Sequence, residues 1–246
     1  MTASPGILFM ISRPVAAYEQ ASIDAGIGPV CFEPPLTFTF RSMAQESISQ
    51  ATGIILSSQT AVESLSSYDV EGKDCWAIGS ATAAAARRQG LTVRGVVEGG
   101  GARFVAALSQ AKIVLPARGL VWPTAEQPAF ELDQALRQHG IQTKRLTAYR
   151  AQVKQEPSDQ TRAWLNRHPS AVAALFSKGC MQAFEQWIRR SDIFWQPSAI
   201  LAIGPRVVNH ACVLNGAPVL WPPVATREAF ARLVRDFSLV DQGRAV

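Results

Sequence analysis

The sequence predicts an α/β protein whose strands and helices alternate and build parallel, doubly wound sheets. Short apolar segments, such as GIIL at residues 53–56 and CWAI at residues 75–78, are each followed by a helical pattern. Several such strand-and-helix pieces resemble one another. With 246 residues, of which 48% are hydrophobic and 17% charged, the chain can bury the core of one large domain or of two ordinary ones. Strict alternation implies parallel strands joined by crossovers of the usual hand.

The first elements run from the N-terminus to an extended linker. Residues 7–11 are almost continuously apolar, as in a strand covered on both faces. We expect a helix to begin at Ser12-Arg13-Pro14 and to end at Gly26, and a strand to follow from Val30. After two prolines, residues 36–40 alternate between polar and apolar, which predicts a linker strand.

Residues 53–90 contain two strand-to-helix turns in close succession. The strand at 53–56 ends at Ser57-Ser58, and the strand at 75–78 leads through Gly79-Ser80 into an alanine-rich helix that Gly90 closes. A helix start presents free backbone N–H groups, which attract anions without any charged side chain. The two turns are therefore the first candidates for a binding site.

The middle of the chain continues the alternation. We expect strands at 91–93 and 113–115, with Arg118 shortly after the second, helices at 104–111 and 128–140, and an extended segment at 143–150. Residues 98–101, EGGG, lack the GxxxxGK[ST] pattern of a phosphate loop, so a flexible loop is predicted. Residues 119–127, which include Pro123, are interpreted as an inserted loop.

The C-terminal third repeats the same order. Strands are expected at 171–176, 198–203 and 219–220, and helices at 177–190, from Gly204-Pro205 to Asn215-Gly216, and at 227–237. Residues 53–65 pair with 173–187, residues 75–93 with 200–219, and residues 14–27 with 128–141. The chain is therefore predicted to contain two similar α/β units. The repeats alone would equally allow these units to be two tandem halves of the chain.

Ligands of doubly wound sheets bind outside the carboxyl ends of the strands. The residues expected at those ends are Ser12, Arg13, Ser57, Ser58, Gly79, Arg118, Ser177, Lys178 and Gly204, and Thr82 lies in a first helical turn. Several of these residues also have a simpler structural interpretation. The serines are preferred helix caps, Thr82 can bond locally, and Arg13 and Lys178 can be solvated charges at the rim.

Composition excludes several classes of protein. The four cysteines and three histidines are dispersed, so neither a metal site nor a disulfide framework is predicted, and no cofactor is expected. The net charge of +5 is spread without a basic stripe, which favours an anionic metabolite over nucleic acid. No window is apolar enough for a membrane span or a signal peptide, so a cytoplasmic location is expected. The chain is also expected to act as a monomer.

In its order of motifs the chain resembles the uroporphyrinogen-III synthase family. The matching stretches are ISRP, ILSSQTAV, AIGSATA, LTAYR, LFSKG and LAIGP. The resemblance implies two similar flavodoxin-like domains with a cleft between them. One domain is formed by residues 1–35 plus 152–246 and the other by 40–147, and the linkers are 34–40 and 144–152. Two departures are the sequence after Gly204-Pro205, where Arg206-Val207-Val208 replaces the family's hydroxyl residues, and the length of 119–127.

The resemblance also implies an activity. Members of the family are lyases of tetrapyrrole biosynthesis that cyclise hydroxymethylbilane to uroporphyrinogen III, with loss of water and inversion of ring D. The family's linker tyrosine matches Tyr149, which would act as an acid at the departing hydroxyl or would only pack the linker. The alternatives are a non-catalytic protein that binds an anionic small molecule and a flavin- or nucleotide-binding module, whose GxGxxG and Walker patterns are missing.

Overall fold

The computed structural model describes residues 5–12, 14–190, 192–208 and 216–240. The chain divides into two compact units, unit 1 from residues 1–37 and 152–246 and unit 2 from residues 38–151. The backbone passes between the units twice, within the strands β3 (Leu36–Phe40) and β8 (Thr143–Val153). Arg41 N–H bonds the carbonyl of Ala148 and Lys154 N–H bonds that of Pro35, so β3 and β8 are antiparallel.

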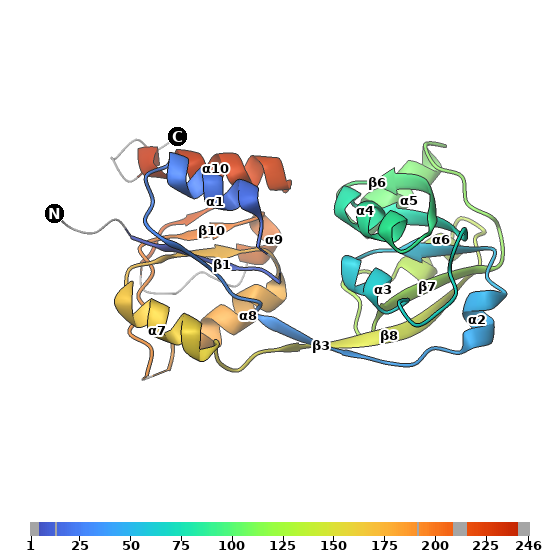
Figure 1. Cartoon of the computed structure of the whole chain (residues 1–246). Helices are drawn as coiled ribbons and strands as arrows, with labels where there is room; N and C mark the ends of the chain where they lie inside the picture. The colour runs from blue at the N-terminus through green and yellow to red at the C-terminus, as the bar shows by residue number, and fades with distance from the viewer. Residues whose placement is uncertain (1–4, 13, 191, 209–215, 241–246) are drawn as a thin grey trace. The chain divides into compact units, whose positions relative to one another are not determined.

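Unit 1 is a five-stranded parallel sheet with helices on both faces (Figure 1). The strand order is β11-β10-β9-β1-β2, which is the flavodoxin-like order. Its elements are β1 (Ile7–Met10), α1 (Ala16–Asp24), β2 (Val30–Phe32), α7 (Asp159–Arg167), β9 (Val172–Leu175), α8 (Lys178–Trp187), β10 (Ile200–Ala202), α9 (Pro205–Val208), β11 (Val219–Leu220) and α10 (Arg227–Val240).

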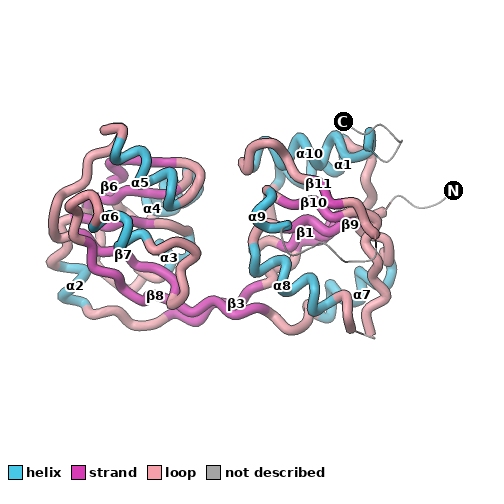
Figure 2. The backbone as a smooth tube through the Cα atoms, turned by 180° about the vertical axis from the view of Figure 1, so that it is seen from behind, coloured by secondary structure: helices cyan, strands magenta, loops and turns pink. Residues whose placement is uncertain are grey.

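The alternation of side chains along β1 explains the two layers of unit 1. Leu8 and Met10 pack with residues of α7 and α8, whereas Ile7 and Phe9 pack with residues of α1 and α10. Every residue of β1 is fully buried, as expected for a central parallel strand. Both views of the backbone show α1 beside α10 on one face of the sheet, with α7 and α8 on the other (Figures 1 and 2).

Unit 2 contains a six-stranded sheet in the order β3-β8-β7-β4-β5-β6, in which β4 to β8 pair in parallel. Ile54 and Leu56 of β4 belong to one core and Ile55 to the core on the opposite face. The further elements are α2 (Gln45–Ser49), β4 (Gly53–Leu56), α3 (Gln59–Glu63), β5 (Asp74–Ile78), α4 (Ser80–Arg88), β6 (Thr92–Val97), α5 (Gly101–Ser109), β7 (Leu120–Ala125) and α6 (Leu132–Arg137).

The repeats predicted from the sequence correspond to equivalent strands. β9, β10, β11, β1 and β2 of unit 1 occupy the same positions in their sheet as β4, β5, β6, β7 and β8 of unit 2. The chain visits these positions in a permuted order, because unit 2 begins at the strand equivalent to β9 and ends at the one equivalent to β2. The predicted fold class, α/β with two similar parallel sheets, is confirmed.

The predicted strand at 113–115 is wrong. Those residues form a bend and irregular backbone, and the strand is β7, within the segment interpreted as an inserted loop. In the sequence, Pro123 argues against a strand there, because proline cannot donate a backbone hydrogen bond. β7 tolerates it because its pairing with β4 ends at Val121, and beyond that residue only β8 is its partner. No insertion is therefore needed to explain 119–127.

Other boundaries also differ from the prediction. The first helix begins at Ala16 and not at Ser12, because Val15 is still extended. Helices α2 and α7 were not predicted, although Ser158 is an N-cap that precedes α7. The predicted helix after Gly204 is described only to Val208, and its predicted end at Asn215 lies outside the described residues.

Candidate functional site

In unit 2 the chain just after β4 lies beside the middle of β8, which brings Ser58 and Tyr149 together. The Tyr149 hydroxyl lies 3.1 Å from Ser58 Oγ, which also accepts a hydrogen bond from Ala61 N–H and so caps α3. The rings of Phe38 and Phe40 meet the Tyr149 ring edge-on. This arrangement places a phenol beside the N-terminus of a helix, although the two residues are 91 positions apart.

The environment of Tyr149 fixes its protonation state. The side chain is 7% exposed and belongs to the core of unit 2. Burial raises its pKa above the ordinary value of 10.0, and the hydrogen bond with Ser58 offsets part of that effect. The phenol is therefore neutral at physiological pH and can donate a hydrogen bond. The ring of Tyr149 packs in the core and its hydroxyl contacts a polar partner. The structure is therefore compatible with both roles expected from the sequence, packing of the linker and proton donation.

Ser57 accepts a hydrogen bond from the buried indole of Trp122. The distance from Trp122 Nε1 to Ser57 Oγ is 3.2 Å. Trp122 lies in β7, which is next to β4 in the sheet. The strand order of the sheet reverses between these two strands, so they flank its topological switch point. Ser57 and Ser58 are both partly exposed. Their hydroxyls therefore serve the fold while remaining within reach of solvent.

At the next turn, the start of α4 already holds a carboxylate of the chain. Gly79 has φ of 96°, a left-handed conformation suited to glycine, and turns the backbone from β5 into α4. Ser80 N–H donates a hydrogen bond of 2.6 Å to Glu98 Oε1. The Thr82 hydroxyl lies 3.9 Å from where a Cβ on Gly79 would be, and Thr82 is 5% exposed. An external anion at this turn would compete with Glu98.

Sequence reasoning missed three charged residues at the same edge of unit 2. Arg41, immediately after β3, pairs with Glu126 at 2.7 Å, and Arg150 of β8 lies 3.6 Å from the other oxygen of Glu126. Glu126 N–H also bonds the carbonyl of Tyr149. The two guanidinium groups and the one carboxylate leave a surplus of one positive charge beside the strand that carries the phenol. The three residues lie in or next to strands that are distant in sequence, so no local sequence pattern indicates that they come together.

In unit 1 the switch point lies between β1 and β9. Ser177 caps α8 by accepting from Cys180 N–H, and the Cys180 thiol donates to the carbonyl of Met10 at the end of β1. Burial raises the pKa of the Cys180 thiol, and hydrogen bonds to its sulfur partly offset this, so it is a structural group that ties the two strand ends. Lys178, the first residue of α8, is exposed and has no ion-pair partner among the described residues.

The other predicted site residues fall into three groups. Ser12 is exposed after β1, and Gly204 is buried after β10, where an added Cβ would come within 3.1 Å of Ala225. Arg13 lies outside the described residues. Arg118 precedes β7 and so lies at the amino end of its strand, because the strand is not where the sequence predicted it. The reason for including Arg118 among the binding residues is therefore removed.

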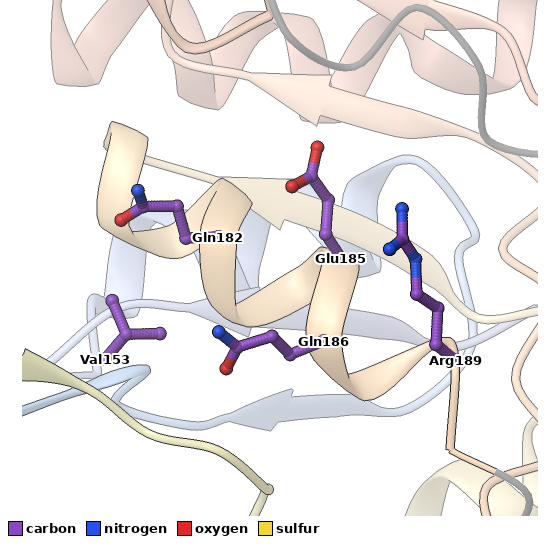
Figure 3. A pocket seen from close by; sticks show the side chains of 5 residues that line it. All are labelled: Val153, Gln182, Glu185, Gln186 and Arg189. Carbon is purple, nitrogen blue, oxygen red and sulfur yellow. The ribbon is translucent and has the colours of Figure 1, made fainter.

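A surface pocket of unit 1 lies elsewhere. Its volume is about 400 Å³, and it is lined by Val153, Gln182, Glu185, Gln186 and Arg189. Figure 3 shows Gln182, Glu185 and Gln186 on α8 and Arg189 just beyond the end of that helix. It includes none of the predicted site residues. The strand ends, and not this pocket, bring together the residues that the fold predicts for binding.

These features define a class of protein with two doubly wound α/β units whose strands end at hydroxyl-capped helices. The chain belongs to the Uroporphyrinogen-III synthase HemD family, whose sequence profile matches residues 17–232. It is similar to the crystal structure of uroporphyrinogen-III synthetase from Helicobacter pylori, with a TM-score of 0.64, 14% identity and coverage of 95% of this chain and 99% of that one.

It is also similar to a mutant uroporphyrinogen III synthase from the extremely thermophilic bacterium Thermus thermophilus, with a TM-score of 0.55, 16% identity and coverage of 98% and 100% of the two chains. At these identities the likeness concerns the fold. No curated protein sequence gives a significant match. Within the described residues, no helix is long and apolar enough to cross a membrane.

Proposed function

We propose that this chain is a uroporphyrinogen-III synthase. It would cyclise hydroxymethylbilane to uroporphyrinogen III, with loss of water and inversion of ring D, and so serve tetrapyrrole biosynthesis. Membership of the family supports the substrate and the reaction class. The observation that carries the proposal is the contact of 3.1 Å between Tyr149 and Ser58 at the capped start of α3, where a proton donor meets a helix N-terminus.

Tyr149 is the proposed acid of the reaction. The terminal hydroxyl of hydroxymethylbilane leaves more readily once its oxygen receives a proton, and water is then the leaving group. A phenol held neutral by burial has that proton at the pH of the cell, and Ser58 can fix the direction of its O–H. Ring closure releases a proton from the reacting pyrrole carbon, so the acid can be restored at the end of the cycle.

The binding of substrate carboxylates is proposed for groups at the strand ends of each unit. In unit 2 these are Ser57, Ser58, Gly79 and Thr82, and in unit 1 they are Ser12, Ser177, Lys178 and Gly204. Arg41 and Arg150 join the set because they flank Glu126 beside Tyr149. Backbone N–H groups and hydroxyls give many moderate hydrogen bonds, which can hold a flexible polycarboxylate in a curved conformation.

The reaction then depends more on conformation than on reactive side chains. Within the described residues, no three His, Cys, Asp or Glu side chains are placed to hold a metal ion together. We propose residues 1–35 plus 152–246 and residues 40–147 as the two domains that share the substrate, and a monomer as the working form. Holding the terminal ring where it can close in the inverted orientation is the step in which the protein must act.

The separation of uroporphyrin isomers tests this function. The protein is incubated with enzymatically made hydroxymethylbilane, the products are oxidised, and the isomers are separated by chromatography. The proposal predicts isomer III, whereas spontaneous closure gives isomer I. Isomer I alone, together with saturable binding of hydroxymethylbilane, would instead identify a non-catalytic protein that binds an anionic small molecule.

A further inference from the structure

Trp221 differs from every other tryptophan of the chain. The sequence contains six tryptophans, and all six lie in the described residues. Trp76, Trp122, Trp164, Trp187 and Trp195 are at most 9% exposed, whereas Trp221 is 44% exposed. Within the described part of the chain, the indole of Trp221 has no hydrogen bond and no ring contact. Single exposed apolar residues are common on protein surfaces, so exposure alone does not indicate a binding role. The position of Trp221 in the fold is what indicates one.

That position is the carboxyl end of a strand in unit 1. Trp221 follows β11 directly, and Leu220 of that strand pairs with Leu201 of β10. Because β11, β10, β9 and β1 run parallel in adjacent positions, Trp221 lies at the same edge of the sheet as Gly204, Ser177 and Ser12. This is the edge at which ligands of doubly wound sheets bind.

The segment that carries Trp221 is held in place. It is followed by Pro222 and Pro223, which restrict the backbone, and Pro222 is buried. Ala225 of the same segment packs against Gly204, where an added Cβ would lie at 3.1 Å. An indole fixed on a stiff segment loses little conformational freedom when a ligand stacks on it.

The same segment leads into the start of α10, where a basic and an acidic side chain follow each other. Thr226 caps α10 by accepting from Ala229 N–H, and Arg227 is the first residue of the helix. A guanidinium group at a helix N-terminus is unfavourable for the helix alone, because the helix dipole is already positive there. Glu228 follows Arg227 in the first turn of α10, so the charges of these two side chains offset each other. The exposed aromatic face of Trp221 is therefore the feature of this segment that matches a flat ring of a ligand.

We propose that Trp221 stacks on one pyrrole ring of the linear tetrapyrrole. The inference rests on the proposed function for the identity of the ligand. It assigns Trp221 to binding and positioning of the substrate and leaves the proton transfer to Tyr149.

Kinetics of two substitutions test the stacking. Trp221→Leu removes the aromatic face and Trp221→Phe keeps one. We expect KM for hydroxymethylbilane to rise about five- to tenfold in Trp221→Leu and by less than about threefold in Trp221→Phe, in line with the strength of aromatic stacking. The control is Phe194→Leu. Phe194 is 71% exposed in the segment that precedes β10, at the amino edge of the same sheet, so its KM should be unchanged.

Fluorescence gives a readout that does not depend on turnover. Trp221 should supply the red-edge emission that acrylamide quenches, and Trp221→Phe should lose that component. Hydroxymethylbilane or uroporphyrinogen III should protect it from acrylamide in the wild type. Equal quenching with and without saturating ligand, or equal KM for Trp221→Leu and the wild type, would overturn the stacking. If isomer III is absent but protection is present, the proposed function fails while the binding role of Trp221 stands.

Discussion

The hydroxyl of Tyr149 can be tested separately from its ring. Tyr149→Phe keeps the contacts with Phe38 and Phe40 and removes only the proposed proton donor. Because a positioned general acid contributes about 10²- to 10⁴-fold to a rate, we expect kcat to fall by about a hundredfold with little change in KM. Single-turnover measurement of isomer III formation gives this rate.

Tyr68→Phe is the matched control for that variant. The Tyr68 hydroxyl bonds the backbone of Met43 in the same unit, so its loss should lower the free energy of unfolding and leave kcat unchanged. Equal turnover of Tyr149→Phe and the wild type would reduce Tyr149 to a packing residue.

Buried groups that titrate in alkali predict how stability responds to pH. Burial raises the pKa of Cys75 from 9.0 to about 11 and that of Tyr18 from 10.0 to about 12. In both cases the folded state holds the proton more tightly, so the stability these groups supply is complete below about pH 9 and is lost as the pH rises towards 12. Urea unfolding at several pH values should show the free energy of unfolding falling over this range.

Tyr18→Phe isolates one of the two groups. The Tyr18 hydroxyl is buried without a hydrogen-bond partner in the described structure, while its ring packs with Phe9, Phe176 and Phe230. The variant should be as stable as the wild type at pH 7, or more stable by about 1 kcal/mol, and should lose less stability at high pH. A large loss of stability at pH 7 would show that the hydroxyl has a partner.

At the scale of elements, a buried carboxylate fixes the start of α7. Glu33 is 4% exposed and accepts hydrogen bonds from Lys154 Nζ at 3.0 Å, Ser158 Oγ at 2.8 Å and Thr161 Oγ1 at 2.7 Å. Burial alone would raise the pKa of Glu33, but these donors more than offset it and hold the pKa below 4.5. Glu33 follows β2 and Lys154 follows β8, so the contact joins the ends of these two strands within unit 1.

Removal of this carboxylate should cost considerable stability. We expect Glu33→Ala to lower the free energy of unfolding by about 3 kcal/mol, because it leaves Lys154 without its partner at a site largely shielded from water. The contribution of Glu33 should persist above pH 4.5 and disappear as the pH falls below it. Asp159→Ala in the first turn of α7 is the control, since that side chain is 97% exposed and should matter by less than about 0.5 kcal/mol.

Elements with a local signal could be predicted from the sequence, and those fixed by distant partners could not. The strand at 53–56 and the helix after Gly79 were predicted because an apolar segment followed by a turn residue identifies them. β7 was missed because Pro123 conflicts with strand propensity, and only its pairing with β8 makes the strand acceptable. That error also misplaced Arg118.

The candidate site likewise contains residues that a local sequence signal predicts and contacts that only distant partners determine. Ser57, Ser58 and Ser177 were found from the strand ends at which they lie. The hydrogen bond of Ser57 with Trp122 and the flanking of Glu126 by Arg41 and Arg150 depend on strand order, which the sequence does not state. The carboxylate of Glu98 at the start of α4 was hidden for the same reason.

At the scale of the whole molecule, the charge predicts a salt effect. A net charge of +5 should attract a polycarboxylate, and the attraction weakens as the Debye length falls from roughly 14 to 4 Å between about 0.05 and 0.5 M ionic strength. We expect kcat/KM for hydroxymethylbilane to fall several-fold over that range, while kcat at saturation stays nearly constant. A kcat/KM that does not depend on salt would show that the substrate is held by apolar contacts alone.

The composition of uroporphyrin isomers formed from hydroxymethylbilane tests the central claim most directly. The native protein should yield isomer III faster than spontaneous closure, and the heat-denatured protein should leave only isomer I. Exclusive formation of isomer I by the native protein, at substrate concentrations that saturate its binding, would contradict the proposed function.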